Sequence, residues 1–292
     1  MGQVDFVTFE KIKKAVYRTG QFLKEKHASG DPSIFEYKEK NVGGHKSLQI
    51  DLLAEDEFVH TLNTVGVPGL VLSEERGEIP LDKQGTRDDV IIVLDPLDGS
   101  SNYKRSIPFS VVSAAIIPYD HFDHASFADL EYGIVYDFWR NKMYGLRDGD
   151  PFEDNRPMMK INDNGSSPAI SLYTYQSEMY GVVFEFEKRA MIRCLGSAAL
   201  ELTYVALGAL SAYVDVRALL KTYDFSVGAK LVELMSGSVT IFRKGEILSP
   251  HDVILTDLSL GYGLVASRDE NTHSLVMPDV KTVFIPNVRT SQ

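Results

Sequence analysis

Two aspartates stand at the end of a run of apolar residues, with a proline and a leucine between them. The run is Val90-Ile91-Ile92-Val93-Leu94, and the aspartates are Asp95 and Asp98. If Pro96 fixes the turn between them, both carboxylates and the Leu97 carbonyl can face one point. Such hard oxygen donors suit Mg²⁺. The segment therefore indicates a magnesium site, although a capped turn without any ligand has the same pattern.

Small residues follow directly, at Gly99, Ser100 and Ser101. They would offer unhindered backbone N–H groups, and the start of a helix at this point would attract a phosphate group. We therefore expect a metal site and a phosphate site side by side.

Further acidic residues suggest that the site is shared. Glu74 and Glu75 follow the apolar segment Leu70-Val71-Leu72, and Asp224 opens a predicted helix. Taken singly, the glutamate pair is compatible with a solvated turn and Asp224 with a helix N-cap. Two acidic strand ends in one chain favour a common site, because ligands of open α/β sheets bind at the carboxyl ends of the strands.

The elements that must position these residues can be predicted from the spacing of apolar residues. Amphipathic helices are expected at 6–23 and 51–65. Strands are expected at 70–72, 90–94, 111–117, 133–138 and 142–146, the last two forming a hairpin. The first half, residues 1–150, is therefore an α+β unit that carries the Glu-Glu and Asp-Pro-Leu-Asp-Gly segments.

A turn-rich stretch at 148–168 is the candidate boundary to a second half, residues 168–292. Here strands are expected at 170–175, 212–216, 239–242 and 264–266, and helices at 182–190, 197–207 and 224–235. This alternation is typical of an α/β unit. The last residues of the chain are expected to form a loose tail.

The composition narrows the class of protein. The chain of 292 residues has a formal net charge of −11, so we expect no basic face for nucleic acid or for an anionic membrane. No apolar run is long enough to span a bilayer. The single cysteine, Cys194, can form no intramolecular disulfide. It is expected to be a buried structural thiol, and it fits a cytoplasmic protein.

Other constellations support no second chemistry. His121 and His124 have a spacing compatible with zinc but no matched ligands, and Asn162-Asp163-Asn164-Gly165 lacks the glutamate of a calcium loop. A solvated loop and a simple turn are expected instead. The sequence has neither a phosphate-binding loop for nucleoside triphosphates nor a serine nucleophile elbow. Metal-assisted hydrolysis is the remaining hypothesis.

The order of these segments resembles one known group of phosphatases, the inositol monophosphatase and fructose-1,6-bisphosphatase superfamily. The segments that carry the resemblance are Ser73-Glu74-Glu75, residues 95–102, Gly196-Ser197-Ala198-Ala199 and the Asp224 helix. The resemblance covers residues 46–237. It departs from the commoner pattern at Ser100, where threonine is usual, and at Tyr223, where tryptophan is common.

This resemblance implies a layered α/β/α/β/α sandwich with the site between the two halves. It also implies a set of metal ligands: Glu74, Asp95, the Leu97 carbonyl, Asp98 and Asp224, with Asp51 and Glu75 as secondary candidates. Helix capping is the alternative role for Asp51. Two or three Mg²⁺ ions, replaceable by Mn²⁺, would activate a water molecule for in-line attack on the phosphate.

Catalytic and phosphate-binding roles follow from the same resemblance. Glu74 and the Ser100 hydroxyl would orient the water, and Gly99, Ser100 and Ser101 would cradle the phosphate. The substrate would be a small phosphate ester, and the protein would form a homodimer.

Substrate choice depends on a shorter motif. Asp215-Val216-Arg217 is similar to archaeal-type members, which often accept both inositol monophosphate and fructose-1,6-bisphosphate. Asp215 could accept hydrogen bonds from a polyol and Arg217 could meet a second phosphate, with a surface ion pair as the alternative. The expected function is thus a Mg²⁺-dependent phosphatase of small polyol or sugar phosphates. A 3′(2′),5′-bisphosphate nucleotidase and a catalytically silent metal- and phosphate-binding regulator are the alternatives.

Overall fold

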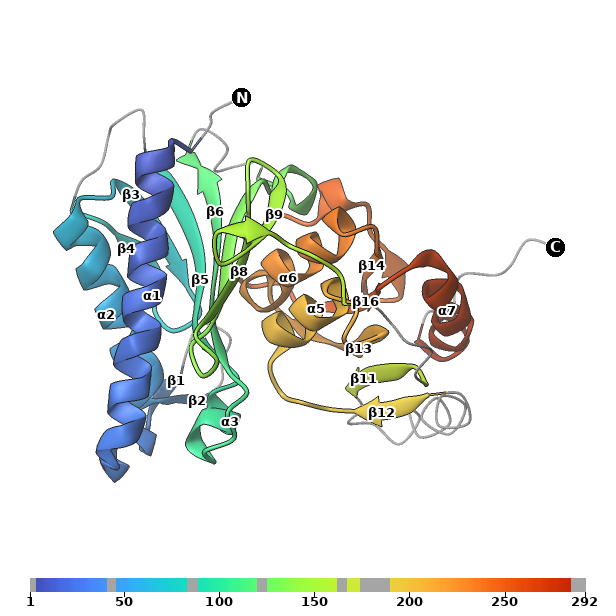
Figure 1. Cartoon of the computed structure of the whole chain (residues 1–292), viewed down its shortest axis with the longest axis horizontal. Coiled ribbons are helices and arrows are strands. Elements are labelled where there is room, and N and C mark those ends of the chain that lie inside the picture. Colours follow the sequence, from blue (N-terminus) through green and yellow to red (C-terminus); the bar gives the residue numbers. More distant parts are fainter. Residues whose placement is uncertain are drawn as a thin grey trace.

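Five layers of helices and sheets make up the described part of the molecule (Figure 1). The computed structural model describes residues 4–40, 46–82, 89–119, 125–161, 167–173 and 190–284. Helices α1 (Phe6–Ser29) and α2 (Gln49–Val65) cover one face of an eight-stranded sheet. Helices α5 (Ala198–Ala206) and α6 (Thr222–Leu234) separate it from a six-stranded sheet, and α7 (Glu270–Phe284) covers the outer face of that sheet. The predicted α/β/α/β/α fold is confirmed.

The first sheet has the strand order β10 (Arg156–Pro157), β9 (Asp150–Glu153), β8 (Lys142–Arg147), β7 (Tyr132–Asp137), β6 (Val111–Pro118), β5 (Val90–Asp98), β3 (Gly69–Ser73) and β4 (Gly77–Pro80). The second has the order β12 (Met191–Arg193), β11 (Ala169–Tyr173), β13 (Ala212–Leu220), β16 (Tyr262–Ser267), β14 (Ser238–Arg243) and β15 (Glu246–Ile247). Strands β1 (Tyr37–Lys40) and β2 (Lys46–Leu48) form a separate antiparallel pair. Short helices are η1 (Pro32–Phe35), α3 (Ser100–Lys104), η3 (Phe127–Asp129) and η5 (Pro250–Asp252).

The parallel pair β3 and β5 places two acidic segments at one edge of the first sheet. Ser73 pairs with Leu94, and the described neighbours elsewhere in this sheet are antiparallel. The Glu74 N–H continues the ladder by donating to the Leu94 carbonyl at 3.1 Å. Because both strands end at the same edge, Glu74 and Asp95 become neighbours.

Local sequence accounts for the helix that covers the first sheet. Helix α1 begins after Asp5, whose carboxylate accepts the N–H groups of Val7 and Thr8, and it ends at Gly30, which has a left-handed φ of 66°. Its buried apolar side chains are Phe9, Ile12, Ala15, Val16 and Leu23. These residues recur at helical spacing, so one face of α1 packs on the sheet.

Three findings differ from the expectations. Residues 270–284 form α7, a helix that is not among the expected elements, and Pro278 lies inside it. The last residues, 285–292, for which a loose tail is expected, lie outside the described residues. Strands β9 and β10 extend the first sheet into the expected boundary stretch. Cys194 is exposed, because it follows the edge strand β12 and not a buried segment. The expected helix at 182–190, His121, His124 and the turn at 162–165 lie outside the described residues, apart from residue 190.

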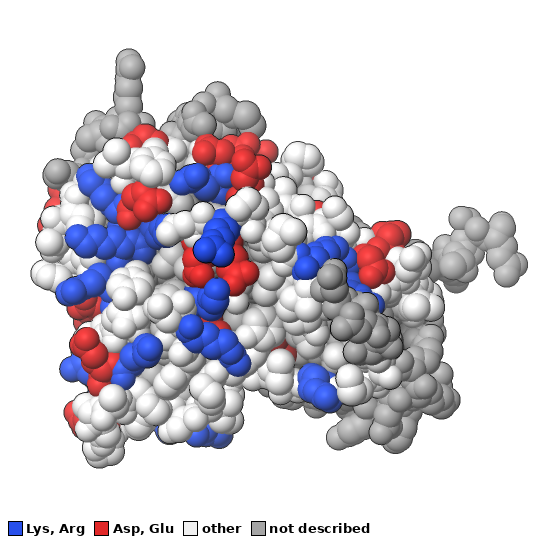
Figure 2. Space-filling model, in the orientation of Figure 1, with Lys and Arg blue, Asp and Glu red and all other residues white. Residues whose placement is uncertain are grey.

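Charged side chains of both signs are interspersed on the face drawn in Figure 2. Lys and Arg side chains gather on the α1 side of this face, with Asp and Glu side chains among them (Figure 2). None of the described helices combines the length and the apolar character needed to cross a bilayer.

Candidate active site

An acidic cluster gathers residues from four elements of the fold. Its members are Glu74 and Glu75 after β3, Asp95 and Asp98 at the end of β5, Asp51 in the first turn of α2, and Asp224 in the first turn of α6. The strand ends come from the first half and α6 from the second. The predicted acidic residues are therefore brought together where the first sheet meets the middle helices.

The carboxyl groups of this acidic cluster have raised pKa values. Burial, followed by the charge of Asp224, raises the pKa of Glu74 well above its ordinary value. Burial and the charge of Glu74 do the same for Asp95. Burial raises the pKa of Asp224 to about 8, and the charge of Asp98 adds to this effect. Carboxylates that repel one another in this way form a site that favours a bound cation.

Asp51 and Asp224 both cap the helices that carry them. Asp51 Oδ2 accepts the Leu48 N–H at 2.8 Å, and Asp224 Oδ2 accepts the Lys221 N–H at 2.6 Å. The capping role is thus present in both residues. Capping uses only one of the two carboxylate oxygens of Asp51. Asp51 is buried, and its Oδ1 has no hydrogen-bond partner among the described residues. A buried carboxylate oxygen of this kind fits a cation ligand.

Asp98 is held by the second half of the chain. Its Oδ2 accepts the Ser197 hydroxyl and the Ala199 N–H, both at 2.7 Å, and its Oδ1 accepts the Ala198 N–H at 3.3 Å. Helix α5 has no side-chain cap of its own, so Asp98 caps it from β5. These bonds lower the pKa of Asp98, but burial outweighs them and raises it to about 7.

Asp95 and Glu75 also have defined partners. Asp95 Oδ1 accepts the Leu97 N–H at 2.9 Å, which closes the turn between the two aspartates. Glu75 accepts the Ser47 hydroxyl, and burial raises the pKa of Glu75 to about 7. Asp95 therefore shapes the turn, whereas Glu75 is tied to β2 at the margin of the acidic cluster.

The donor set fits a hard divalent cation in its chemistry. All six side chains offer carboxylate oxygens, and the uncompensated Asp51 Oδ1 adds a buried acceptor. As they stand, however, no three His, Cys, Asp or Glu side chains within the described ranges are arranged to hold one ion. Asp98 and Asp224 instead direct carboxylate oxygens towards helix N–H groups. The ligand set therefore stays a prediction.

The expected phosphate cradle lies at the start of α3. Gly99 has a φ of 90°, and a Cβ at this position would lie 2.9 Å from the Phe109 carbonyl oxygen, so the turn requires glycine. A cavity of about 440 Å³ adjoins the cradle. Its lining residues are Tyr37, Leu48, Ser100, Ser101, Lys104 and Arg105. Its volume lies within the range of small-molecule sites.

Asp215 and Arg217 form an ion pair on β13. Arg217 Nη2 lies 2.5 Å from Asp215 Oδ2, and the guanidinium lies 4.5 Å from the centre of the Tyr173 ring. Asp215 is fully buried and the Arg217 side chain is 13% exposed, so the pair is not the surface pair considered above. The charge of Asp215 contributes, after burial, to the raised pKa of Asp224, which places the pair beside the acidic cluster.

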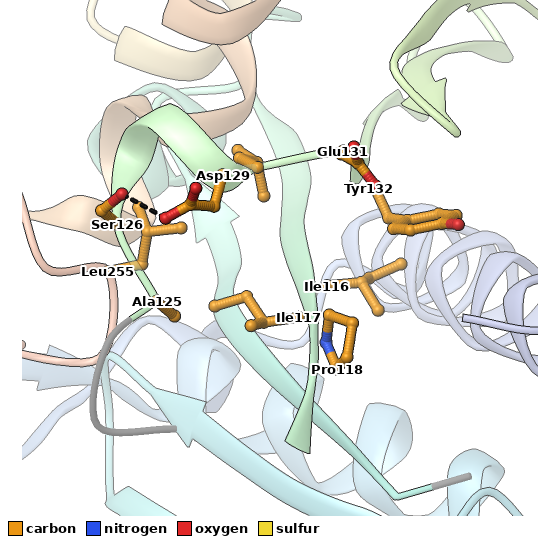
Figure 3. Close-up of a pocket in the computed structure, with 10 residues that line it drawn as sticks. Ile116, Ile117, Pro118, Ala125, Ser126, Asp129, Glu131, Tyr132 and Leu255 are labelled. Carbon is orange, nitrogen blue, oxygen red and sulfur yellow. Dashed lines mark hydrogen bonds between the residues drawn. The ribbon is translucent and has the colours of Figure 1, made fainter. Parts of the chain in front are cut away.

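A small pocket at the opposite end of β6 is not the site (Figure 3). Its lining is mainly apolar, and two of its polar members, Ser126 and Asp129, hydrogen-bond to each other at 2.5 Å. The volume of about 20 Å³ is room for about one water molecule. Neither the acidic cluster nor the expected phosphate cradle 99–101 contributes to its lining.

Three residues at the site receive no role from the sequence patterns. Ser197 binds Asp98, and Asn102 Nδ2 donates to the Leu195 carbonyl at 2.7 Å. Glu201 is fully buried in α5 behind Ser197. The available signal for Glu201 is a single glutamate in an otherwise uncharged helix, because buried charged residues nearly always have partners.

Known proteins are similar to this chain over most of its length. The model of the Inositol monophosphatase family matches residues 5–283. A fructose-1,6-bisphosphatase/inositol-1-monophosphatase of Methanothermobacter thermautotrophicus is 32% identical over 241 residues, 80% of this chain and 83% of the relative. The Nus factor SuhB of Escherichia coli is 27% identical over 216 residues, 71% and 74% of the two chains. The extragenic suppressor protein SuhB of Bartonella henselae has the same fold, with a TM-score of 0.70, 20% identity and coverage of 94% and 98%.

Proposed function

Because the chain belongs to the inositol monophosphatase family, we propose that it is a Mg²⁺-dependent phosphatase of small polyol and sugar monoesters. Inositol 1-phosphate and fructose-1,6-bisphosphate are the proposed substrates. The observation that carries the proposal is the acidic cluster, whose carboxyl groups raise one another's pKa where β3 and β5 end. A site of this charge has to bind cations before it can accept an anionic phosphate.

The proposed ligands are Glu74, Asp95, the Leu97 carbonyl, Asp98 and Asp224, with Asp51 and Glu75 as secondary candidates. Glu74 and the Ser100 hydroxyl would orient the attacking water, and the backbone N–H groups of 99–101 would hold the phosphate oxygens. When bound, Mg²⁺ supplies positive charge for the phosphate oxygens and lowers the pKa of water. The fixed contacts of Asp98 and Asp95 keep the turn between metal and phosphate in one shape.

Three observations bear on the substrate class. The cavity beside Ser100 and Ser101 has room for a polyol, and Lys104 and Arg105 give it positive charge. Asp215 is the proposed acceptor for hydroxyl groups of a polyol, but it is fully buried and bound by Arg217, so a polyol would have to displace that contact. The relative with 32% identity bears the names of both proposed activities. Arg217 is already bound to Asp215. It could therefore contact a second phosphate only if its guanidinium bound Asp215 and the phosphate at the same time.

Phosphate release from a panel of esters tests the proposal. The panel contains inositol 1-phosphate, fructose-1,6-bisphosphate and adenosine 3′,5′-bisphosphate, each offered to metal-stripped protein and then with Mg²⁺ or Mn²⁺. We expect release from the first two only when metal is present, and loss of activity on addition of a chelator. Full activity of the metal-stripped protein would overturn the proposal.

The same panel separates the alternatives. A nucleotidase would prefer adenosine 3′,5′-bisphosphate. A silent regulator would bind a phosphate ester tightly in a calorimeter and release phosphate from none. The name Nus factor for a relative with 27% identity gives a reason to include this binding measurement.

A further inference from the structure

Glu201 binds three consecutive backbone N–H groups in the turn that precedes its own helix. Its Oε1 accepts the Leu195 N–H at 3.1 Å, and its Oε2 accepts those of Gly196 and Ser197 at 3.3 and 3.4 Å. Glu201 is fully buried, so no bulk water competes for these donors. The carboxylate therefore determines the shape of the turn 195–197, to which we refer as the clasp turn.

Two side chains of β11 bind Glu201 from the other side. The hydroxyls of Ser171 and Tyr173 donate to its two oxygens, and both residues lie on one face of the strand because they are two positions apart. The Tyr173 hydroxyl also accepts the Gly196 N–H at 2.7 Å. Donors thus face both oxygens of Glu201, which suits a carboxylate and not its amide. Burial outweighs these hydrogen bonds and raises the pKa of Glu201 above its ordinary value. Glu201 links the second sheet to the clasp turn.

The clasp turn and the residues after it hold the acidic and phosphate-binding segment of the first half. The Ser197 hydroxyl binds Asp98, and the Leu195 carbonyl accepts the Asn102 side chain at 2.7 Å. Gly196 has a φ of 90°, and a Cβ there would lie 2.9 Å from Asn102 Nδ2. The two segments thus approach so closely that a change in the turn must displace Asp98 or Asn102.

We propose that Glu201 is a positioning residue. It fixes the clasp turn, and through Ser197 and Leu195 the clasp turn holds Asp98 and Asn102, which lie on either side of the expected phosphate cradle 99–101. This inference rests on the proposed function. Glu201 itself touches neither substrate nor cation, and it acts through Ser197 and Leu195. Its role is the same for every substrate of the site, because the clasp turn contacts the common phosphate-binding segment.

Glu201→Gln is the direct test, because it keeps the size of the side chain and replaces one acceptor oxygen by a donor that faces other donors. The matched control is Thr203→Val, which lies in the same helix, is buried, and loses a hydroxyl bond to the Ala199 carbonyl. Hydrogen exchange of the amides of 195–199 reports on the clasp turn without any substrate. We expect faster exchange in Glu201→Gln and wild-type exchange in the control. If Glu201→Gln folds poorly, Tyr173→Phe provides the test instead. It removes one donor to Glu201, and we expect a smaller increase in exchange of the same amides.

The functional measurements are Mg²⁺ affinity by calorimetry and kcat/KM on the ester panel. We expect Glu201→Gln to lose about 10–100-fold in either quantity, the usual effect of a residue that orients a metal ligand. Ser197→Ala should add little to this loss in the double variant, because both changes release Asp98. Unchanged hydrogen exchange in Glu201→Gln would overturn the inference. Faster exchange would overturn it too, if the Mg²⁺ affinity and kcat/KM of Glu201→Gln stay equal to those of the Thr203→Val control. A wild-type protein that neither binds Mg²⁺ nor releases phosphate would overturn the proposed function, while the exchange result would still decide whether Glu201 holds the clasp turn.

Discussion

Glu201 and Asp95 are both buried carboxylates, and their surroundings are opposite. Glu201 accepts hydrogen bonds from three backbone N–H groups and two hydroxyls. Asp95 accepts the Leu97 N–H and otherwise faces the charges of Glu74, Asp98 and Asp224. Burying a charge without compensation costs free energy. The environment of Glu201 is therefore supplied by the fold itself, whereas Asp95 would gain its missing compensation from the proposed cation.

The largest effect should come from neutralising a member of the acidic cluster. We expect Asp95→Asn and Asp224→Asn each to lower kcat by roughly 10²–10³-fold at saturating Mg²⁺, the usual range when an electrostatic group is lost from an active site. The melting temperature of the metal-free protein should stay unchanged or rise, because repulsion is relieved. Glu201→Gln should lower that temperature instead. Near-normal turnover of either aspartate variant would remove it from the proposed ligands.

The pH dependence of metal-free stability should be the next largest effect. Burial raises the pKa of Asp51 and of Asp224 from 3.8 to about 8, so the folded state binds more protons than the unfolded state between these values. This contribution to stability is complete below pH 3.8 and is lost as the pH rises through about 8. Denaturant unfolding at several pH values, without metal, measures it. Excess Mg²⁺ should abolish the decline in stability. If the stability of the metal-free protein instead rose between pH 3.8 and about 8, the carboxyl groups of the acidic cluster would not have the raised pKa values described above.

Arg217→Ala should have a moderate effect that does not depend on the substrate. This change leaves the buried Asp215 without the guanidinium that pairs with it. We expect the free energy of unfolding to fall by about 1.5–3 kcal/mol, the range for a hydrogen bond to a charged group. Because the guanidinium is engaged by Asp215 and stacked on Tyr173, kcat/KM should fall equally on inositol 1-phosphate and fructose-1,6-bisphosphate. A loss on the bisphosphate alone would instead assign Arg217 to the second phosphate.

Cys194→Ser should have the smallest effect. Cys194 is exposed and precedes the clasp turn, which Glu201 holds by backbone N–H groups and not by side chains. We expect stability within about 0.5 kcal/mol of wild type and unchanged kcat/KM, as for most surface substitutions. A clear loss of stability or of kcat/KM would show that the side chains beside the clasp turn contribute as much as the Glu201 carboxylate. The unfolding free energy and the ester panel provide both measurements.

The sequence predicts most of the regular elements, because their apolar spacing is strong. The helix at 6–23 and the strand at 90–94 are confirmed, although β5 continues through the turn to Asp98. Helix α7 is missed because Pro278 argues against a helix interior, where its ring and missing N–H are unfavourable. The exposure of Cys194 is missed because apolar neighbours on an edge strand look the same in sequence as those in a core.

The site is predictable only in part, since motifs name residues but not their partners. Asp95, Asp98 and Glu74 are singled out by their place after apolar runs, and the structure brings them together. The contacts of Asp98 with α5 have no local signal, because they join separate segments. The contacts of Glu201 have no motif for the same reason, and the available signal is its place as a single glutamate in an otherwise uncharged helix. Its donors come from the preceding turn and from a strand about 30 residues earlier.

The Asp98 to Ser197 hydrogen bond spans 99 positions of the chain, which has a consequence for folding. Closing so long a loop is slow, and contacts of this kind form late on a folding pathway. The first half can therefore collapse before the second half supplies the groups that hold Asp98. The proposed cation, which needs the finished site, would give little help to the early steps. It would act on the completed molecule and slow unfolding more than it accelerates folding.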